Sequence, residues 1–487
     1  MASKPLARQS APLVLPAWTA AGLLLLACII TRAIWFGDPA AGFDEQLYSL
    51  VGQRMLEGEL PFVDIWDRKP LGLFALFALA HGIAGPGPMA YQLLALAFTF
   101  AGAMLVHALA RPIADRTGAL VAGAAYPVLM PLFGNHSGQS ETFFVPLVLA
   151  SLWLVTRNRT ALSNRDAMLA MLLGGLALQV KYSALPMCGA IGLMALWRLH
   201  RQGADAGSLA RRAAVFAALG IAPTALVFAL YAAIGHGEAF WSANFLSFFS
   251  REGAGRWNDV IGIFFLPLAL PALAGLWLAQ RLARPADGAL YACYCVFGLA
   301  SLATVFLPGT IYRYYLAALV PGAILVALPF LAHRAVAARL AVLALFAAYA
   351  SYYVAIPQTE KSQTNRAGIA RLAEAIAPHV DRENCLFIFD GPSVLYAATD
   401  SCLPSRFAYP DHLNNALEVN ALDIRQAAEV ARILNLQPPV IVTASEPVTL
   451  QNEAASTLVE AAVARDYRAL ATARIDHRMI TAWKRRD

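Results

Sequence analysis

Long apolar runs alternate with short polar segments over the first 356 residues of the chain. A helix that crosses a bilayer at right angles needs about 20 apolar residues, although several of these runs are shorter. The candidate spans are Leu13–Phe36, Pro88–Ala110, Gly118–Phe133, Phe143–Thr156, Ala167–Lys181, Ala184–Trp197, Ala213–Ile234, Val260–Gln280, Ala289–Leu307, Tyr314–Ala332 and Leu340–Ile356. The pattern predicts a mainly α-helical, polytopic membrane protein with about eleven spans.

The segment Leu71–Gly85 decides the orientation of the chain. It is apolar but short and runs into a Gly-Pro-Gly-Pro sequence, so it fits either a span or a helix at the membrane interface. If it does not cross, the basic loops all fall on the side of Lys4 and Arg8. Their bases are Arg111, Arg116, Arg157, Arg159, Arg165, Arg198, Arg201, Arg211, Arg212, Arg281, Arg284, Arg334 and Arg339. Because cytoplasmic loops are rich in Lys and Arg, we expect an interfacial helix, with the N-terminus inside and the C-terminus outside.

The stretch Gly42–Lys69, which we call the first outer loop, is polar in a chain that is only 14% charged. Its charged residues are Asp44, Glu45, Arg54, Glu57, Glu59, Asp64, Asp67, Arg68 and Lys69. Such a polar stretch beside membrane spans is a place where chemistry is expected.

The first outer loop should begin with a short amphipathic helix that lies flat on the membrane surface. Its apolar positions are Phe43, Leu47, Leu50, Val51 and Met55, and Gly58 is a plausible stop. Asp44 and Tyr48 lie one turn apart on the other side of this helix. An ionised Asp44 could accept a proton or pair with a cation, or it could merely cap the helix.

Composition supports the membrane assignment. Hydrophobic residues make up 59% of the 487 residues, and the mean hydropathy is +0.56. The net charge of +6 would suggest a nucleic-acid partner in a soluble protein, but here the bases cluster between apolar runs, as in cytoplasmic loops. The first apolar run has no convincing cleavage site, so we expect a retained span rather than a removed signal.

The sequence from residue 357 to residue 487 is predicted to form a soluble α/β domain outside the membrane, following a transmembrane domain over residues 1–356. Helices are expected at Ala367–Ile376, Ile424–Leu434 and Ala454–Ala464, and strands at Cys385–Phe389, Pro439–Thr443 and Arg478–Trp483. No glycine-rich phosphate-binding motif accompanies these strands, so nucleotide binding has no support.

Two of the six cysteines, Cys385 and Cys402, lie in this polar region, whereas Cys28, Cys188, Cys293 and Cys295 fall in apolar runs. No metal-ligand spacing joins them to histidines. A disulfide between Cys385 and Cys402 is expected if the region faces an oxidising compartment; two unrelated buried cysteines are the alternative.

Further ionisable and aromatic residues are predicted at the outer ends of later spans. Glu141 follows a base-free loop, Lys181-Tyr182 ends one span, and Arg313 with Tyr315 begins another. Lys181 and Arg313 could simply extend to lipid headgroups. Together with Arg68 and Lys69, however, these cations suit a phosphate-bearing lipid substrate.

These motifs carry a resemblance to a known family. Asp44-Glu45-x-x-Tyr48, followed by Lys69-Pro70 and an apolar interfacial helix, resembles the GT-C membrane glycosyltransferases, in the branch of the protein O-mannosyltransferases and the lipid A aminoarabinose transferases. The similarity covers roughly the first 200 residues and extends through Gln139-Ser140-Glu141 and Lys181.

The resemblance implies transfer of a hexose or pentose from a polyprenyl-phosphate donor to a glycan, lipid or protein of the cell envelope, on the outer face of the bacterial cytoplasmic membrane. It makes Asp44 the general base and Lys69 the holder of the donor phosphate, with Glu45 and Glu141 as further catalytic acids. Tyr48, Arg68, Lys181, Tyr182, Arg313 and Tyr315 are the expected substrate-binding residues. No cofactor is expected with certainty, and a divalent cation at the carboxylates stays open.

A transporter or flippase of lipid-linked glycans is the alternative function. Such a protein should have repeated halves and ionisable groups near the middle of the membrane. The sequence has neither feature, since its charged groups gather on one outer surface.

Overall fold

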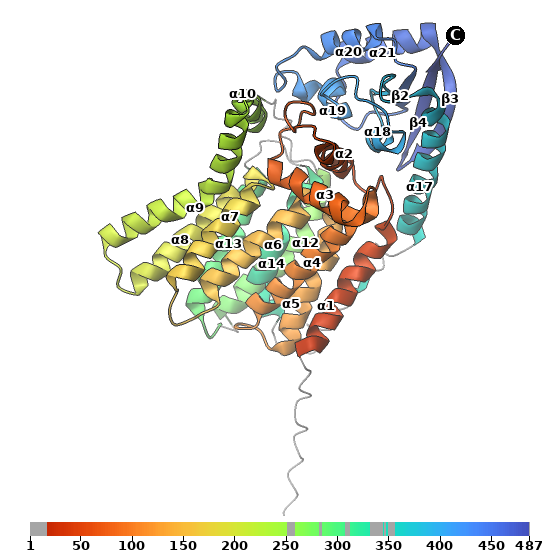
Figure 1. Ribbon diagram of the computed structural model, residues 1–487. Coiled ribbons are helices and arrows are strands. Elements are labelled where there is room, and N and C mark those ends of the chain that lie inside the picture. Colours follow the sequence, from red (N-terminus) through yellow and green to blue (C-terminus); the bar gives the residue numbers. More distant parts are fainter. Residues whose placement is uncertain are drawn as a thin grey trace, which may run out of the picture.

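The computed structural model describes residues 17–250, 259–281, 285–306, 312–331 and 356–486, together with 344, 347 and 348. A bundle of long helices carries a smaller domain with a β-sheet at one end (Figure 1). The first outer loop and helix α3 lie between these two parts.

Every predicted apolar run that falls within the described residues forms a helix. The bundle contains α1 (Ala17–Arg32), α4 (Pro88–Ala110), α5 (Arg116–Leu129), α6 (Ser140–Thr156), α7 (Asn164–Leu178), α8 (Leu185–Arg201), α9 (Ala206–Ala233), α12 (Asp259–Arg281), α13 (Gly288–Phe306), α14 (Val320–Val326) and α15 (Leu328–Leu331). The short helices α10 (Gly237–Trp241) and α11 (Ser247–Ser250) follow α9. The predicted span Leu340–Ile356 lies almost entirely outside the described residues.

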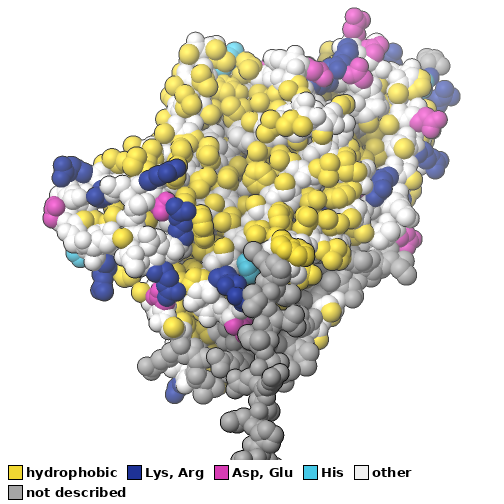
Figure 2. Space-filling view, turned by 60° about the horizontal axis from the view of Figure 1, so that its bottom comes forward, with side chains coloured by type: hydrophobic (Ala, Val, Ile, Leu, Met, Phe, Trp, Pro, Cys, Tyr) yellow, Lys and Arg dark blue, Asp and Glu magenta, His cyan; other side chains and the backbone are white. Residues whose placement is uncertain are grey.

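The bundle has the surface of a membrane protein. Hydrophobic side chains cover much of the face in Figure 2, and many large ones are exposed, such as Leu193 and Leu226. Helix α9 is 28 residues long; its most apolar stretch of 18 residues has a mean hydropathy of 2.2, yet only 6% of that stretch is buried inside the protein. An apolar helix with so little protein contact is stable in lipid rather than in water.

Helix α3 (Leu71–Ala84) crosses the end of the bundle instead of running alongside the other helices (Figure 1). This placement agrees with the predicted interfacial helix. The first turn of α3 packs tightly against the segment that follows α7. A Cβ on Gly72 would lie 2.6 Å from the carbonyl oxygen of Gln179.

Helix α2 (Asp44–Leu56) forms where it was predicted, and Gly58 follows it with a φ of 97°. Its predicted position flat on the membrane surface is wrong. Both of its sides are covered, since α3 packs on one and the C-terminal domain on the other, and Leu47, Tyr48 and Leu50 are each 1% exposed. The cause is close packing: a Cβ on Gly52 would lie 2.8 Å from the backbone nitrogen of Ala78 in α3.

The C-terminal domain is built on a four-stranded sheet in the order β1-β2-β4-β3. Strand β1 (Phe387–Ile388) pairs in parallel with β2 (Val440–Ala444), and β4 (Arg478–Arg485) pairs antiparallel with both β2 and β3 (Tyr467–Ile475). The three predicted strands are present. Strand β3 was not predicted, because alanines alternate with Arg and Thr in it and favour no strand until β4 pairs with them.

Helices cover both faces of this sheet. Helix α17 (Ile356–Ile376) packs Ile369 and Leu372 against one face, and α20 (Gln426–Asn435) with α21 (Glu453–Asp466) covers the other. The shorter helices are α18 (Val394–Ala398) and α19 (Pro410–Asn414). The three predicted helices of the tail are confirmed, and the division of the chain at residue 356 stays a prediction.

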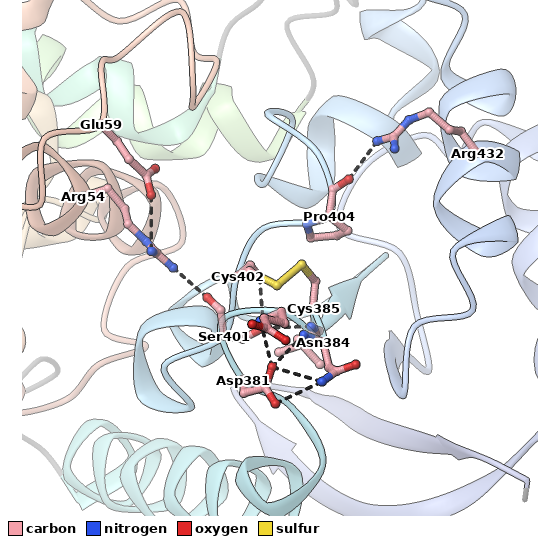
Figure 3. Close-up of a disulfide and its surroundings, with 11 residues drawn as sticks. Arg54, Glu59, Asp381, Asn384, Cys385, Ser401, Cys402, Pro404 and Arg432 are labelled. Carbon is pink, nitrogen blue, oxygen red and sulfur yellow. Dashed lines mark hydrogen bonds and ion pairs between the residues drawn. A yellow bond between two sulfur atoms is a disulfide. The ribbon is translucent and has the colours of Figure 1, made fainter.

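A disulfide joins Cys385 to Cys402 as expected, next to the contact between the C-terminal domain and α2 (Figure 3). Arg54 of α2 donates a hydrogen bond of 2.6 Å to the carbonyl oxygen of Ser401, beside the disulfide. The exposed pair Glu57–Arg382 and a bond of 2.8 Å from the Trp66 amide to the Arg406 carbonyl add further contacts. The domain is therefore docked on the first outer loop.

Candidate active site

A cavity of about 240 Å³ lies where the first outer loop, the end of the bundle and the C-terminal domain meet. It is lined by Phe43, Asp44, Asp67, Arg68, Lys69, Pro70, Lys181, Tyr182, Ser183, Asn244, Phe248, Tyr312, Tyr314, Tyr315, Tyr409, Asp411, His412, Glu418, Val448 and Thr449. Six of the predicted site residues are among them. Segments that are far apart in the sequence thus converge on one partly enclosed space that contains several charged side chains.

Asp44 lies in the first turn of α2 and faces this cavity. Its Oδ1 accepts a hydrogen bond of 2.8 Å from the hydroxyl of Tyr409, and its Oδ2 accepts bonds of 3.2 Å from Tyr48 and 3.4 Å from Gln139. Burial and the nearby Asp44 raise the pKa of both phenols, so each stays protonated and donates. The N-cap is Phe43, without a capping side-chain bond, so the helix-cap alternative gains no support.

Lys69 reaches the cavity beside Asp44, with its Nζ 5.4 Å from the centre of the Tyr48 ring. Burial alone would lower its pKa, but the carboxylates of Asp67 and Asp44 raise it, so the amine is charged. Among the cavity-lining cations that the structure describes, Lys69 has no carboxylate oxygen within 4.0 Å. It is therefore a charged group that is available to an anion.

Asp67 was counted in the first outer loop but not assigned to the site. Its Oδ1 accepts the backbone N–H of Lys69 at 2.7 Å, and its Oδ2 lies 3.7 Å from Nε2 of His412. Burial would raise the pKa of Asp67, but Lys69 and His412 hold it well below its usual range. Burial lowers the pKa of His412 despite Asp67. Asp67 is thus an anion that fixes the backbone in front of Lys69.

Arg68 makes a two-pronged ion pair with Glu418 of the C-terminal domain, in which each of its two terminal nitrogens donates to one carboxylate oxygen. Its guanidinium also lies 5.5 Å from the centre of the Trp66 ring. Both charged groups line the cavity.

Lys181, which lines the cavity, forms a buried ion pair with Glu141. The Nζ of Lys181 lies 4.0 Å from the centre of the Tyr315 ring. Glu141 is 1% exposed and does not line the cavity, so its contact with the site runs through Lys181. Tyr182 lines the cavity and donates to Oδ1 of Asn244 at 3.1 Å.

Glu45 is not brought to the cavity. Its carboxylate accepts hydrogen bonds from the backbone N–H groups of Gly138 and Gly42 and from the hydroxyl of Tyr91. Burial raises its pKa to about 7, although Ser137 and Gly138 act to lower it. Glu45 therefore joins the first outer loop to the loop before α6.

Arg313 is not brought to the cavity either. Its guanidinium lies 3.9 Å from the position that a Cβ on Gly134 would take, whereas the neighbouring Tyr312, Tyr314 and Tyr315 line the cavity.

The C-terminal domain supplies site residues that the sequence did not reveal, namely Tyr409, Asp411, His412 and Glu418. They follow no span and form no recognisable motif. Their partners Asp44 and Arg68 precede Tyr409 and Glu418 by 365 and 350 positions. Only the docking of the domain brings them together.

The site gives little support to a bound metal. In the part of the chain that the structure describes, no three His, Cys, Asp or Glu side chains are grouped so that they could hold an ion. Both oxygens of Asp44 accept bonds from O–H or N–H donors, and Asp67 is held by Lys69 and His412. A divalent cation at these carboxylates stays a prediction, and no step below depends on one.

An apolar helical bundle, juxtamembrane helices after the first span and a docked C-terminal sheet domain make up the GT-C fold of membrane glycosyltransferases. Residues 68–226 match the family model of the dolichyl-phosphate-mannose-protein mannosyltransferases. The crystal structure of apo ArnT from Cupriavidus metallidurans is similar, with a TM-score of 0.64 and 16% identity over 96% of this chain and 98% of that one.

The structure of the same ArnT bound to undecaprenyl phosphate gives a TM-score of 0.62 at 15% identity, over 96% of this chain and 97% of that one. No curated protein matched the sequence. The likenesses confirm the predicted fold class and the resemblance to this branch of the GT-C enzymes.

Proposed function

We propose that the protein is a membrane glycosyltransferase that moves a sugar from a polyprenyl-phosphate donor to a hydroxyl group of a cell-envelope glycan, lipid or protein. The observation that carries the proposal is that Asp44 and the charged Lys69 face the same cavity at the end of an apolar bundle. The donor class is supported by the similar fold of ArnT, which has been crystallised with undecaprenyl phosphate.

The geometry suits one displacement at the sugar. Asp44 takes the proton of the acceptor hydroxyl while the acceptor oxygen forms a bond to the anomeric carbon. The bond from that carbon to the phosphate oxygen breaks, and its electron pair stays on the phosphate. Lys69 stabilises the negative charge that grows there, and Lys181, held by Glu141, lines the same cavity. A partly enclosed site strengthens these charge interactions because little water screens them.

We infer that the site and the C-terminal domain face the periplasm of a bacterial cytoplasmic membrane. The disulfide Cys385–Cys402 in that domain fits an oxidising compartment. The arginines between α6 and α7, and those at the facing ends of α8 and α9, suit the cytoplasmic side.

Reporter fusions test this orientation. Fusions after Gly85 and after Asp487 are both expected to report the periplasmic side, because α3 crosses the end of the bundle without spanning the membrane. A fusion within 202–205, between α8 and α9, should report the cytoplasm and serves as the control. A cytoplasmic signal after Gly85 would reverse the placement of the site.

Transfer itself is tested with purified protein in liposomes, a radiolabelled sugar on undecaprenyl phosphate and a cell-envelope extract. Label is expected to move from the lipid to an acceptor, with release of undecaprenyl phosphate. Label that crosses the bilayer while still attached to the lipid would favour the flippase alternative. That alternative has less support, since four of the predicted charged residues line one cavity at one end of the bundle, namely Asp44, Arg68, Lys69 and Lys181.

A further inference from the structure

The Arg68–Glu418 pair is a feature of the cavity that the proposed mechanism does not use. Arg68 belongs to the first outer loop and Glu418 to the C-terminal domain, and both guanidinium nitrogens that face the carboxylate donate to it. The side chains are 16% and 5% exposed, so the pair is shielded from water. The carboxylate takes one N–H from each of the two terminal nitrogens of Arg68 and neutralises its charge, which weakens its attraction for a phosphate.

The charge balance of the cavity shows why this matters. Its described lining includes three cationic side chains, Arg68, Lys69 and Lys181, and four carboxylates, Asp44, Asp67, Asp411 and Glu418. Glu141, which does not line the cavity, also neutralises the charge of Lys181. Among these described side chains the carboxylates outnumber the cations, so a phosphate that enters competes with Glu418 for Arg68.

The reaction increases the need for positive charge at the phosphate. A sugar phosphodiester carries one negative charge, whereas the phosphomonoester that leaves carries up to two near neutral pH. The site thus needs more positive charge at the phosphate after bond breaking than before, and a cation that becomes available at that point favours the transition state over the ground state. Arg68 precedes Lys69 in the chain and lines the same cavity.

We propose that Glu418 holds Arg68 before the donor binds and yields it to the phosphate, so that Glu418 sets the affinity of the site for lipid phosphate. Glu418 is the last residue of a single short turn, Ala416–Glu418, so the carboxylate that competes for Arg68 does not belong to a long helix of the domain. This inference rests on the proposed function, since it takes a polyprenyl phosphate as the ligand.

The test compares the binding of undecaprenyl phosphate to the purified full-length protein and to Glu418→Gln. Removing the competing carboxylate is expected to tighten binding about tenfold, because Arg68 is then unpaired beside the phosphate. Glu57→Gln is the matched control: it breaks another contact between the same two domains, Glu57–Arg382, away from the cavity, and should leave binding unchanged. A double-mutant cycle shows whether the tighter binding depends on Arg68. In a protein that already carries Arg68→Gln, adding Glu418→Gln should change the affinity for undecaprenyl phosphate very little.

Hydrogen exchange of the Trp66 amide, which donates to the Arg406 carbonyl across the domain contact, reports docking in each variant. Unchanged or weaker binding in Glu418→Gln, or faster exchange at Trp66, would overturn the proposal and leave Glu418 as a docking residue. Failure of the unsubstituted protein to bind undecaprenyl phosphate would instead refute the proposed function, so the two failures are distinguishable.

Discussion

Replacing Asp44 with asparagine is expected to lower kcat by about 10²–10⁴-fold while binding of the lipid donor stays close to its original value. Asparagine has nearly the same shape and keeps an oxygen for the hydroxyl of Tyr409, which lies 2.8 Å from Asp44, so the fold should survive. It cannot take the proton of an acceptor hydroxyl. The loss should therefore appear in turnover and not in donor affinity.

Asp64→Asn is the control for this variant. Asp64 belongs to the same loop, but its carboxylate accepts the Leu60 amide at 2.7 Å at an exposed position and does not line the cavity. Both variants should be matched for folding and assayed with a radiolabelled lipid donor. Turnover by Asp44→Asn at the original rate would remove Asp44 from the mechanism. A role confined to the helix would cost about 1 kcal/mol of stability with the rate per folded molecule unchanged.

Sequence reasoning located the core of the candidate site because local patterns carry that information. Asp44 and Lys69 lie in a polar stretch between apolar segments, and the arginine asymmetry placed Leu71–Gly85 at the interface, where α3 crosses the end of the bundle. Helical periodicity predicted α2. It could not predict that two layers would bury this helix, because that depends on the close approach of Gly52 to α3.

Glu45 illustrates the limit of adjacency in sequence. Consecutive residues on a helix point about 100° apart, and here Asp44 and its neighbour face different surroundings. Asp44 faces the cavity, whereas Glu45 binds the backbone of Gly138 in the loop before α6. The two acids are adjacent in the sequence, but in the helix their side chains contact different parts of the protein.

The residues from the C-terminal domain could not be predicted for a different reason. Tyr409 and Glu418 meet the first outer loop only because a disulfide-closed domain docks on α2 through contacts such as Arg54 to Ser401. No local pattern encodes a contact across 350 residues. One consequence is that the domain is part of the site, so its removal should disable the base as well as expose the cavity.

Replacing Lys69 with alanine should affect binding and chemistry together. The side chain is charged, and none of the described carboxylate oxygens lies within 4.0 Å of its amine, so a phosphate can take it without displacing an ion-pair partner. A hydrogen bond between charged groups is worth about 1.5–3 kcal/mol, so undecaprenyl phosphate should bind about 10–100-fold more weakly. Transfer should also slow, because the leaving phosphate loses a stabilising charge.

Two variants make the Lys69 result specific. Lys69→Arg keeps the charge and should lose less affinity than Lys69→Ala, although a guanidinium does not reproduce an ammonium at a tight site. Lys361→Ala removes another cation, which pairs with Asp476 at 2.6 Å away from the cavity, and should leave both binding and transfer unchanged. Asp44→Asn and Lys69→Ala should then differ in kind, the first reducing turnover alone and the second reducing donor affinity as well. Equal donor affinity in Lys69→Ala and the unsubstituted protein would show that Lys69 balances the charge of Asp67 and does not hold the phosphate.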